Sequence, residues 1–362
     1  MVARYDIAIV GAGMAGASLA AAIGDRARVL ILEGEAQPGY HATGRSAAFW
    51  VESYGGPGVQ PLTAASGPVL RELGLLVRRG ALTLGSAGQE GDVEAFAETY
   101  RAVGVDVQLL DRAALDARVP HLREHWTCGA LEPDTCDIDV AGLHQHYLAR
   151  VRKGGAELWC RAGLAAAQRT ADGWALTLSD GREVSATILV DAAGAWADPV
   201  ARLAGQRPLG ITPYRRTIVQ LAVSPEVPGD LPLVLDISGS FYFKPESGRI
   251  WLSPHDETPS EPCDAAPEEI DVAHAIDRFE RAVDWPVARL EHRWAGLRSF
   301  APDRLPVYGF APDEPRFFWF AGQGGFGIQT APAAAELGAR LLLGDEAGPV
   351  DPRPFAPSRF AV

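Results

Sequence analysis

Three glycines near the N-terminus have the spacing of a nucleotide-binding turn. Gly11, Gly13 and Gly16 fit the pattern G-x-G-x-x-G. They lie between a strand-type run, Ile7–Val10, and a helix-type segment rich in small residues. In such a turn the first glycine permits the bend, the second lets the backbone approach a pyrophosphate, and the third lets the helix pack on the strand. Because the helix N-terminus also attracts phosphates, the sequence predicts a dinucleotide site here.

An acidic residue follows at a distance that suits a ribose. Glu33 lies about 20 residues after Gly11, at the end of a second strand-type run, Val29–Leu32. Its carboxylate is placed to accept hydrogen bonds from the ribose diol and to repel a 2′-phosphate. The alternative is a glycine turn that only packs a helix on a strand; strand, turn, helix and acid together favour the nucleotide. Nicotinamide and flavin cofactors share this turn, so other segments must distinguish them.

Three further segments suit a long cofactor. The loop His41–Ala48 offers small residues, hydroxyls and Arg45, although Thr43 or Ser46 could instead be an ordinary helix cap. The segment Val190–Trp196 is a second glycine turn, with helix packing as its alternative role. The cluster Gly324–Gly327 is too flexible for the interior of a helix or strand. These segments favour FAD.

Taken in order, these segments give the chain a resemblance to a known family. It resembles the D-amino acid oxidase and glycine oxidase superfamily of FAD-dependent oxidoreductases, most closely the bacterial D-arginine dehydrogenase type. The resemblance covers nearly the whole chain. Its motifs are Asp6–Gly16 with Glu33, Gly39–Ala47, Val190–Trp196, Ala295–Phe300 and Gln323–Thr330. It implies an α/β fold, with a discontinuous Rossmann-like FAD-binding domain and a second domain built on a mostly antiparallel sheet.

The turn and the resemblance together imply a set of cofactor-binding residues. They are Gly11, Gly13, Met14, Ala15, Gly16, Glu33, Gly34, His41, Thr43, Gly44, Arg45, Ser46, Ala47, Ala48, Leu164, Ala192, Ala193, Gly194, Trp196, Arg298, Gly324, Gly325, Phe326, Gly327, Ile328, Gln329 and Thr330. His41 is equally open to a structural role. The resemblance implies that Gly324–Gly327 approaches the pyrimidine side of the flavin. It also implies noncovalent FAD, because no cysteine lies near Arg298 in the sequence.

The substrate side is expected to hold a carboxylate. A bidentate arginine is well suited to orienting an α-amino acid so that its Cα–H faces the flavin. The resemblance assigns this role to Arg298, with Tyr242 adding a hydroxyl and Arg216 a further contact. Arg215 could replace Arg216 after a shift of one residue.

Other residues bear on the size and polarity of the pocket. Tyr54 and Tyr214 are expected to close it, although packing is as common a role for tyrosine. The resemblance would place a carboxylate at Ala81 in relatives that oxidise cationic D-amino acids. Alanine there, with Phe49 and Trp50 as apolar walls, predicts a substrate with an uncharged side chain.

The predicted reaction is oxidation of the CH–NH₂ group of a D-amino acid by hydride transfer to FAD. The resulting imino acid would hydrolyse to a 2-oxo acid and ammonia. The alternatives are an oxidase of secondary amines such as sarcosine, or of glycine; a flavoprotein that serves only as a binding partner; and a nicotinamide dehydrogenase. The sequence leaves oxygen and a quinone open as electron acceptors. It shows no metal-ligand spacing.

Composition limits the partners. The 362 residues carry a formal charge of -13, which disfavours nucleic acid. The four cysteines, Cys128, Cys136, Cys160 and Cys263, form no C-x-x-C pair and indicate reduced thiols in a cytoplasmic protein. No stretch is apolar enough to predict a transmembrane segment, and no signal peptide is expected.

The elements that must position these residues divide into two domains. Strand and helix patterns alternate near both ends of the chain, and strand-like segments dominate its middle. We therefore expect an FAD-binding domain from residues 1–75, 140–211 and 290–348. A substrate-binding domain is expected from residues 76–139 and 212–289. Residues 349–362 are expected to form a surface tail.

Overall fold

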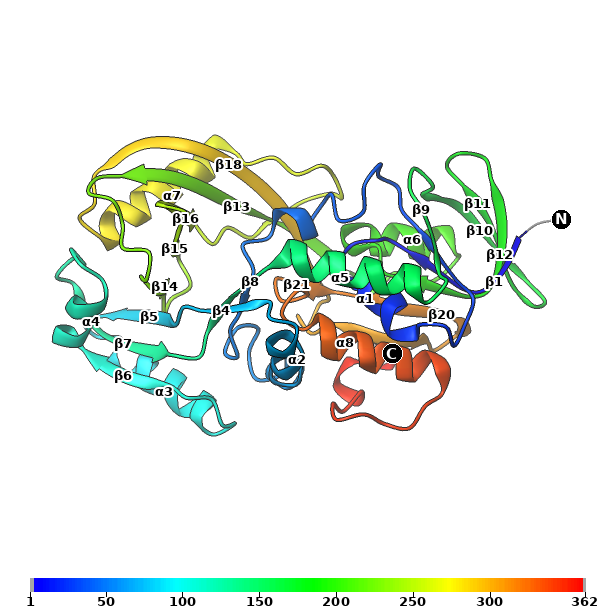
Figure 1. Cartoon of the computed structure of the whole chain (residues 1–362), viewed down its shortest axis with the longest axis horizontal. Helices are drawn as coiled ribbons and strands as arrows, with labels where there is room; N and C mark the ends of the chain where they lie inside the picture. Colours follow the sequence, from blue (N-terminus) through cyan, green and yellow to red (C-terminus); the bar gives the residue numbers. More distant parts are fainter. Residues whose placement is uncertain (1–2, 361–362) are drawn as a thin grey trace.

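The structure is a computed structural model, and it describes residues 3–360 of the chain. Two large sheets lie towards opposite ends of the long axis, and helices flank both of them (Figure 1). Each sheet takes strands from well-separated parts of the sequence. The predicted α/β class with a second, mostly antiparallel sheet is confirmed.

The first sheet has eight strands. They are β1 (Ala3–Val10), β2 (Val29–Leu32), β9 (Glu157–Trp159), β10 (Leu164–Thr170), β11 (Gly173–Leu178), β12 (Glu183–Asp191), β19 (Val307–Ala311) and β20 (Glu314–Ala321). The central strands β9, β2, β1, β12 and β20 are parallel neighbours. All four residues of β2 are buried, as expected for a parallel strand covered on both faces.

Three helices cover one face of this sheet, and a short helix packs on the other. The first group is α1 (Met14–Ile23), α5 (Val140–Lys153) and α8 (Ala331–Leu343). Because α1 consists mostly of alanine and glycine, both neighbouring helices can pack closely against it. The opposite face packs on α6 (Ala197–Leu203), which directly follows the 3₁₀ helix η2 (Gly194–Trp196). The carboxyl ends of β1 and β12 therefore lie beside both glycine turns.

The second sheet has ten strands. They are β5 (Ala81–Ser86), β6 (Gln108–Asp111), β7 (Trp126–Glu132), β13 (Thr212–Val223), β14 (Leu233–Asp236), β15 (Tyr242–Glu246), β16 (Arg249–Ser253), β17 (Thr258–Pro259), β18 (Val287–Phe300) and β21 (Gln323–Gly324). Their order is β21-β18-β13-β16-β15-β14-β5-β7-β6, and β17 pairs with β13. Every pair is antiparallel except β14 with β5.

Side chains of the second sheet alternate between a core and a cavity. Leu82 and Leu84 of β5 enter a hydrophobic core with Phe279 of α7 (Glu269–Ala282). This core also contains residues of α4 (Arg112–Arg118), and α3 (Glu90–Arg101) packs near β5 and β7. The alternate residues of β5, Ala81 and Thr83, point to the opposite face. Thr83 on that face lines the cavity described below.

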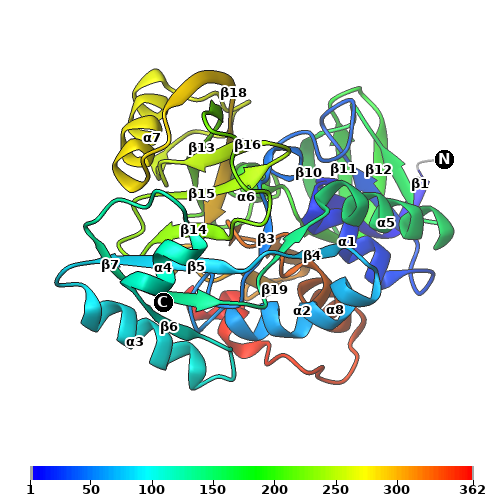
Figure 2. The same cartoon turned by 60° about the vertical axis from the view of Figure 1, so that its left-hand side comes forward.

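A small third sheet lies between the two large ones. It has the order β3-β8-β4. Its strands are β3 (Phe49–Trp50), β4 (Leu76–Arg78) and β8 (Cys136–Ile138), and α2 (Gln60–Glu72) runs beside them in the turned view (Figure 2). The turn η1 (Thr43–Arg45) precedes β3. This sheet carries the chain from the cofactor loop to the second sheet.

Two details differ from the expectations. The predicted boundary at residue 290 falls inside β18, which pairs with β13 along most of its length. The C-terminal segment was expected to be a surface tail, but it forms the turns η3 (Arg353–Phe355) and η4 (Pro357–Phe360). Phe355 is only 2% exposed, with its ring 5.7 Å from that of Tyr308. The burial of this aromatic side chain fixes residues 353–360 to the core; residues 361–362 are not described.

Within residues 3–360, no helix combines the length and apolarity that crossing a membrane requires. The same residues contain no group of three or more histidine, cysteine or acidic side chains placed to hold a metal ion.

Candidate active site

The turn after β1 has the close packing that a pyrophosphate site needs. Gly11 has φ of +101°, and a Cβ on it would lie 2.5 Å from the carbonyl oxygen of Ala192. A Cβ on Gly16 would overlap the carbonyl oxygen of Gly11. The first glycine is therefore required by the backbone conformation, and the third by the close approach of α1 to the turn.

Side chains from two other segments secure the start of α1. The N–H of Met14 donates to Oγ1 of Thr43 at 2.9 Å. The N–H of Ala12 donates to Oε2 of Glu33, and the N–H of Glu35 donates to Oε1 of the same carboxylate, both at 2.9 Å. Each carboxylate oxygen has a second lone pair. Glu33 is thus fixed in position and still able to accept a ribose hydroxyl.

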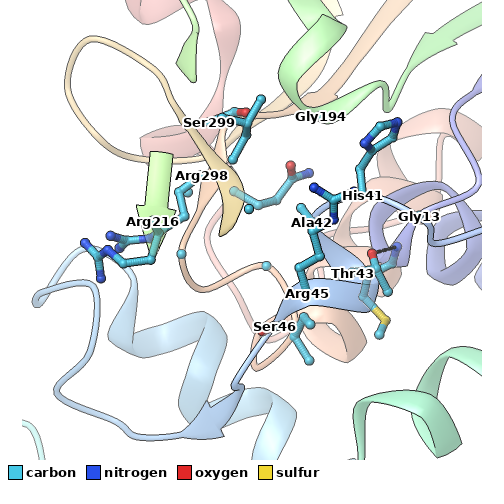
Figure 3. A pocket seen from close by; sticks show the side chains of 18 of the residues that line it. Gly13, His41, Ala42, Thr43, Arg45, Ser46, Gly194, Arg216, Arg298 and Ser299 are labelled. Atoms are coloured by element: carbon cyan, nitrogen blue, oxygen red, sulfur yellow. Dashed lines mark hydrogen bonds between the residues drawn. The ribbon is translucent and has the colours of Figure 1, made fainter. Parts of the chain in front are cut away.

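One cavity of about 890 Å³ runs from this turn to the second sheet. Figure 3 shows Gly13, His41 and Thr43 on one side of it and Arg216 and Arg298 on the other. Its volume lies in the range of cofactor and ligand sites. The sequence-predicted residues that line it are Gly11, Gly13, Met14, Ala15, Glu33, Gly34, His41, Thr43, Arg45, Ser46, Ala47, Ala48, Tyr54, Leu164, Ala192, Ala193, Gly194, Trp196, Arg216, Tyr242, Arg298, Gly324, Gly325, Gly327, Ile328 and Gln329.

Four predicted cofactor residues lie behind the lining instead of in it: Gly16, Gly44, Phe326 and Thr330. The N–H of Gly44 donates to the Gly39 carbonyl at 2.8 Å and closes the cofactor loop. The hydroxyl of Thr330 donates to the carbonyl of Phe326 at 2.8 Å, and the Phe326 ring is buried. These residues support the backbone that lines the cavity.

His41 and Trp196 form one wall of the cofactor end. Their rings lie 4.6 Å apart. His41 Nε2 and Glu35 Oε1 are hydrogen-bonded at 2.9 Å, whereas Nδ1 of the same ring is buried without a protein partner. A buried polar atom of this kind suits a ligand contact, because buried nitrogen atoms are otherwise almost always hydrogen-bonded.

Arg45 lines the cavity, but its guanidinium is occupied elsewhere. It forms an ion pair with Asp264 and donates to the carbonyl oxygens of Ala265 at 2.7 Å and Ala295 at 3.2 Å. The indole N–H of Trp294 donates to the Arg45 carbonyl at 2.9 Å. Arg45 therefore joins the cofactor loop to the second sheet, and its charge is neutralised there.

Arg298 stands at the boundary between the two ends of the cavity. Its Nη2 donates to the Tyr54 hydroxyl at 2.6 Å, and its Nη1 donates to Glu257 at 3.0 Å. Nε is buried without a partner. A Cβ on Gly325 would overlap this guanidinium, so the glycine cluster leaves space for the arginine. The Arg298 guanidinium thus lies in the cavity wall beside the Gly324–Gly327 cluster.

Arg216 lines the cavity, and Arg215 does not. Adjacent residues of β13 point to opposite faces of the sheet. Arg215 forms ion pairs with Glu268 and with Asp271 of α7, outside the cavity. Arg216 lines the cavity and is 5% exposed; burial and the charge of Arg298 lower its pKa. The ambiguity between the two arginines is resolved in favour of Arg216 as the cavity residue.

Tyr242 lies on the same face of the sheet. Burial raises its pKa, so its hydroxyl remains protonated and able to donate a hydrogen bond at neutral pH. The neighbouring ring of His255 is 5.8 Å away. Burial, followed by the charge of Arg216, lowers the pKa of His255 to about 4, so this imidazole is neutral near pH 7. The surroundings of Arg216 and Arg298 are therefore polar without adding positive charge.

Glu257 is the counter-ion of the arginines. One of its oxygens accepts from Arg298 at 3.0 Å, from Arg216 at 3.3 Å and from Arg304 at 2.8 Å. Burial raises the pKa of this carboxyl, but the bond from Arg304 and the charges of Arg298 and Arg216 outweigh burial and hold it below its usual value. Glu257 thus remains ionised at neutral pH.

Some pocket predictions were only partly correct. Phe49 lines the cavity, but Trp50 points the other way, into the core, where its indole N–H donates to the Thr63 carbonyl at 2.9 Å. This follows from the alternation of side chains along β3. Tyr214 is not in the lining; its ring packs 6.0 Å from Phe300. Ala81 is buried in an apolar cluster with Tyr54 and Tyr242 among its members.

Sequence reasoning missed much of the substrate end. The additional lining residues include Val51, Ser53, Thr83, Glu132, Leu233, Leu235 and His255. They come from separate strands, and none belongs to a motif with fixed spacing. Alternating patterns could have placed Thr83 and Leu235 on one face of a sheet. No pattern in the sequence brings Glu132 beside Ala81, because strand pairing determines that contact.

The site fits FAD. The glycine turn closes against Ala192, Glu33 is fixed at the end of β2, and the cavity continues past His41 to the Gly324–Gly327 cluster. Cys263 also lies in the lining, on the loop whose next residue pairs with Arg45. The dinucleotide turn and the arginines are thus two ends of one continuous site.

Comparisons with known proteins agree with this geometry. The chain is 27% identical over 384 aligned positions to glycine oxidase of Geobacillus kaustophilus, covering 99% of the chain and 98% of that protein. The crystal structure of glycine oxidase from that organism superimposes with a TM-score of 0.86 at 24% identity, covering 99% of both chains. The L-proline dehydrogenase structure from P. horikoshii gives a TM-score of 0.85 at 20% identity, covering 99% of this chain and 98% of that one.

A shorter match is found with hydrogen cyanide synthase subunit HcnC of Pseudomonas aeruginosa. The identity is 28% over 258 residues, covering 70% of this chain. The match spans only 60% of the length of HcnC. A family model described as FAD dependent oxidoreductase matches residues 6–341. The chain therefore belongs to the DAO family of FAD-dependent oxidoreductases.

Proposed function

We propose that the protein oxidises the CH–NH₂ group of a D-amino acid. The observation that carries this proposal is the meeting of Arg298, Arg216, Tyr54 and Tyr242 at one end of the FAD cavity. Two largely enclosed guanidinium groups and two phenol hydroxyls form a strong receptor for a carboxylate. An acid held there has its α-carbon directed towards the cofactor end.

FAD, when bound, accepts a hydride from the α-carbon, and the imino acid released hydrolyses to a 2-oxo acid and ammonia. The protein orients the substrate relative to the cofactor end of the cavity. Arg298 and Arg216 hold the carboxylate, and Tyr54 and Tyr242 donate hydrogen bonds to it. Glu257 keeps the two arginines charged and fixed. The protonated Tyr242 and the neutral His255 add no charge that would repel the amine.

The D configuration and the side chain are finer parts of this proposal. The expectation of an uncharged side chain depended on Ala81, Phe49 and Trp50, and of the two aromatic residues only Phe49 lines the cavity. The lining beyond the arginines includes Thr83, Leu233 and Leu235. This additional volume supports a substrate with a side chain, in preference to glycine.

A second candidate is oxidation of glycine or of a secondary amine such as sarcosine. It is favoured by the match to glycine oxidase along almost the whole of both proteins. Arg298 and the cofactor end would serve this reaction equally well. A flavoprotein that acts only as a binding partner is the candidate of another class, and the four convergent polar side chains argue against it. The nicotinamide alternative is wrong, because the family is FAD-dependent.

The deciding experiment uses the FAD-loaded protein without oxygen. It is mixed in turn with D-amino acids, their L-enantiomers, glycine and sarcosine, and loss of the flavin's visible absorbance is followed. Reduction by D-amino acids, with formation of the 2-oxo acid, supports the proposal. Reduction confined to sarcosine or glycine transfers the assignment to the second candidate, and no reduction by any amine indicates a binding role. Admission of air, or of a quinone, then identifies the electron acceptor.

We also propose noncovalent FAD and a cytoplasmic location. The four cysteines are free, as in a reducing compartment, which supports the location. The attachment of FAD can be tested directly, since Cys263 lies in the cavity lining. Acid denaturation should release the flavin into solution. Flavin that stays with the precipitated protein, and is freed by Cys263→Ser, would contradict noncovalent binding.

A further inference from the structure

A second buried carboxylate lies in the same cavity, away from the arginines. Glu132, the last residue of β7, lines the cavity and is 4% exposed. Within residues 3–360, its hydrogen-bond donors are the hydroxyl of Ser53 and, at 3.3 Å, the Ser53 N–H. Among the described residues, no arginine, lysine or histidine pairs with it. Glu132 therefore differs from Glu257, which contacts three arginines.

Strand pairing places Glu132 on the substrate side of the sheet. It is directly opposite Ala81 in the antiparallel pair β5–β7, so the two side chains project from the same face. Ala81 belongs to the apolar cluster that also contains Val51, Tyr54 and Tyr242. The pairing thus places a carboxylate beside this apolar cluster.

The spacing from the arginine end suits a long substrate. Tyr242 is on β15 and Glu132 on β7, and β14 and β5 lie between these strands. Neighbouring strands are separated by about 4.8 Å, so three intervals give roughly 14 Å between the two backbones. Both Tyr242 and Glu132 line the cavity. Ser53, which binds Glu132, directly precedes Tyr54, which binds Arg298.

The electrostatics indicate what Glu132 would bind. A buried carboxylate is costly unless a cation or hydrogen-bond donors compensate it. Burial, and the nearby charge of Glu52, raise the pKa of Glu132 to about 7 in spite of its bonds from Ser53. A cationic or donor group brought by the substrate would restore the ionised form.

We propose that Glu132 is a specificity-determining residue that binds a positively charged, hydrogen-bond-donating group at the far end of the substrate's side chain. The inference rests on the proposed amino acid oxidation. The preferred substrate is then a D-amino acid with an amino or guanidino group at the end of a long side chain. This preference is the opposite of the uncharged side chain that Ala81 suggested. Arg298 and Arg216 bind the substrate's carboxylate, and Glu132 selects substrates by the length and charge of their side chain.

The test compares D-lysine with D-norleucine, which has the same carbon skeleton without the terminal amine. The FAD-loaded wild-type protein should oxidise D-lysine with a kcat/KM roughly 10- to 100-fold higher than that for D-norleucine, as expected for a charged hydrogen bond. This comparison is made with the wild-type protein alone, so it does not depend on a variant that folds correctly. A ratio near one, or one that favours D-norleucine, overturns the proposal.

Glu132→Gln keeps the shape and an acceptor for Ser53, and removes the charge. It should lower the D-lysine to D-norleucine ratio roughly 10- to 100-fold. The ratio is the readout, because a general loss of activity would lower the rates with both substrates equally. Asp134→Asn is the matched control, since Asp134 is an exposed carboxylate two residues away that pairs with Arg78 at the surface. An unchanged ratio in Glu132→Gln means that Glu132 only holds the Ser53 segment, which overturns the proposal.

Failure here can be distinguished from failure of the proposed function. If D-norleucine reduces the flavin but the ratio is insensitive to Glu132→Gln, only the role of Glu132 is wrong. If no D-amino acid reduces the flavin, the proposed function is wrong, and the inference about Glu132 falls with it.

Discussion

The two ends of the cavity are built in different ways. At the cofactor end, backbone groups approach the site, and side chains such as Thr43 and Glu33 mainly fix that backbone. At the substrate end, charged and hydroxyl side chains from β7, β13, β15 and β18 converge over one face of a sheet. The cofactor end depends on glycines, which leave space for the backbone to approach the site. The substrate end depends on particular polar side chains. They should therefore respond differently to substitution.

The largest expected effect comes from the cofactor end. Gly11→Ala should abolish FAD binding, because the new Cβ would meet the Ala192 carbonyl at 2.5 Å and the backbone has φ of +101°. The purified variant should be colourless, which the ratio of flavin to protein absorbance measures. Gly91→Ala is the control, since a Cβ there meets nothing within 4 Å. A yellow Gly11→Ala protein with normal FAD content would contradict the predicted role of the turn.

The substrate end should lose activity without losing FAD. Arg298→Met removes the carboxylate anchor and should lower kcat/KM for a D-amino acid about 100- to 1000-fold. FAD content should stay normal, because the glycine turn is intact. Arg293→Met is the control, an exposed arginine on the same strand. Equal activity in Arg298→Met and the control would show that the carboxylate is bound elsewhere.

The same contrast explains what could be predicted from sequence. The glycine turn and Glu33 are local patterns, and their geometry follows from short stretches of chain. Arg298 and Tyr242 required the family resemblance. Glu132 was missed because its position depends on the pairing of Ala81 with a residue far along the chain.

Other errors arose from burial that local composition does not reveal. Trp50 was assigned to the pocket because a two-residue strand gives no alternation from which to choose a face. Phe355 lies in a segment rich in proline and charge, which resembles a surface tail. Its burial beside Tyr308 is determined by tertiary packing.

A smaller effect is expected from a single hydroxyl. Tyr242→Phe removes one donor to the substrate carboxylate while the ring remains packed near His255. It should lower kcat/KM about tenfold, the usual size for one hydrogen bond to a charged group. Steady-state kinetics with one D-amino acid would measure this. A loss as large as that of Arg298→Met would mean that Tyr242, and not the arginine, is the principal anchor.

A further effect concerns stability and not activity. The pKa of Glu132 is raised from 4.5 to about 7, so its contribution to folding is fully present below about pH 4.5 and is lost as pH rises through 7. The full shift corresponds to roughly 3 kcal/mol. Glu52 and Tyr100 are the titratable neighbours, and Tyr100 stays neutral because burial, and then the charge of Glu132, raise its pKa to about 12.

Glu132→Gln should therefore melt at a higher temperature than the wild type at pH 8, and the difference should shrink towards pH 5. Thermal denaturation of the FAD-loaded proteins across this range would measure it. If the difference in melting temperature does not change with pH, Glu132 has the same pKa in the folded and unfolded protein, which contradicts this prediction.

The central claim is that one cavity holds FAD at its glycine end and a substrate carboxylate at Arg298. Anaerobic mixing of the FAD-loaded wild type and Arg298→Met with the same D-amino acid tests it most directly, through the rate of flavin reduction at rising substrate concentration. The account predicts rapid, saturable reduction in the wild type and slow reduction, without saturation over the same concentrations, in the variant. Equal rates and equal saturation in the two proteins would contradict it.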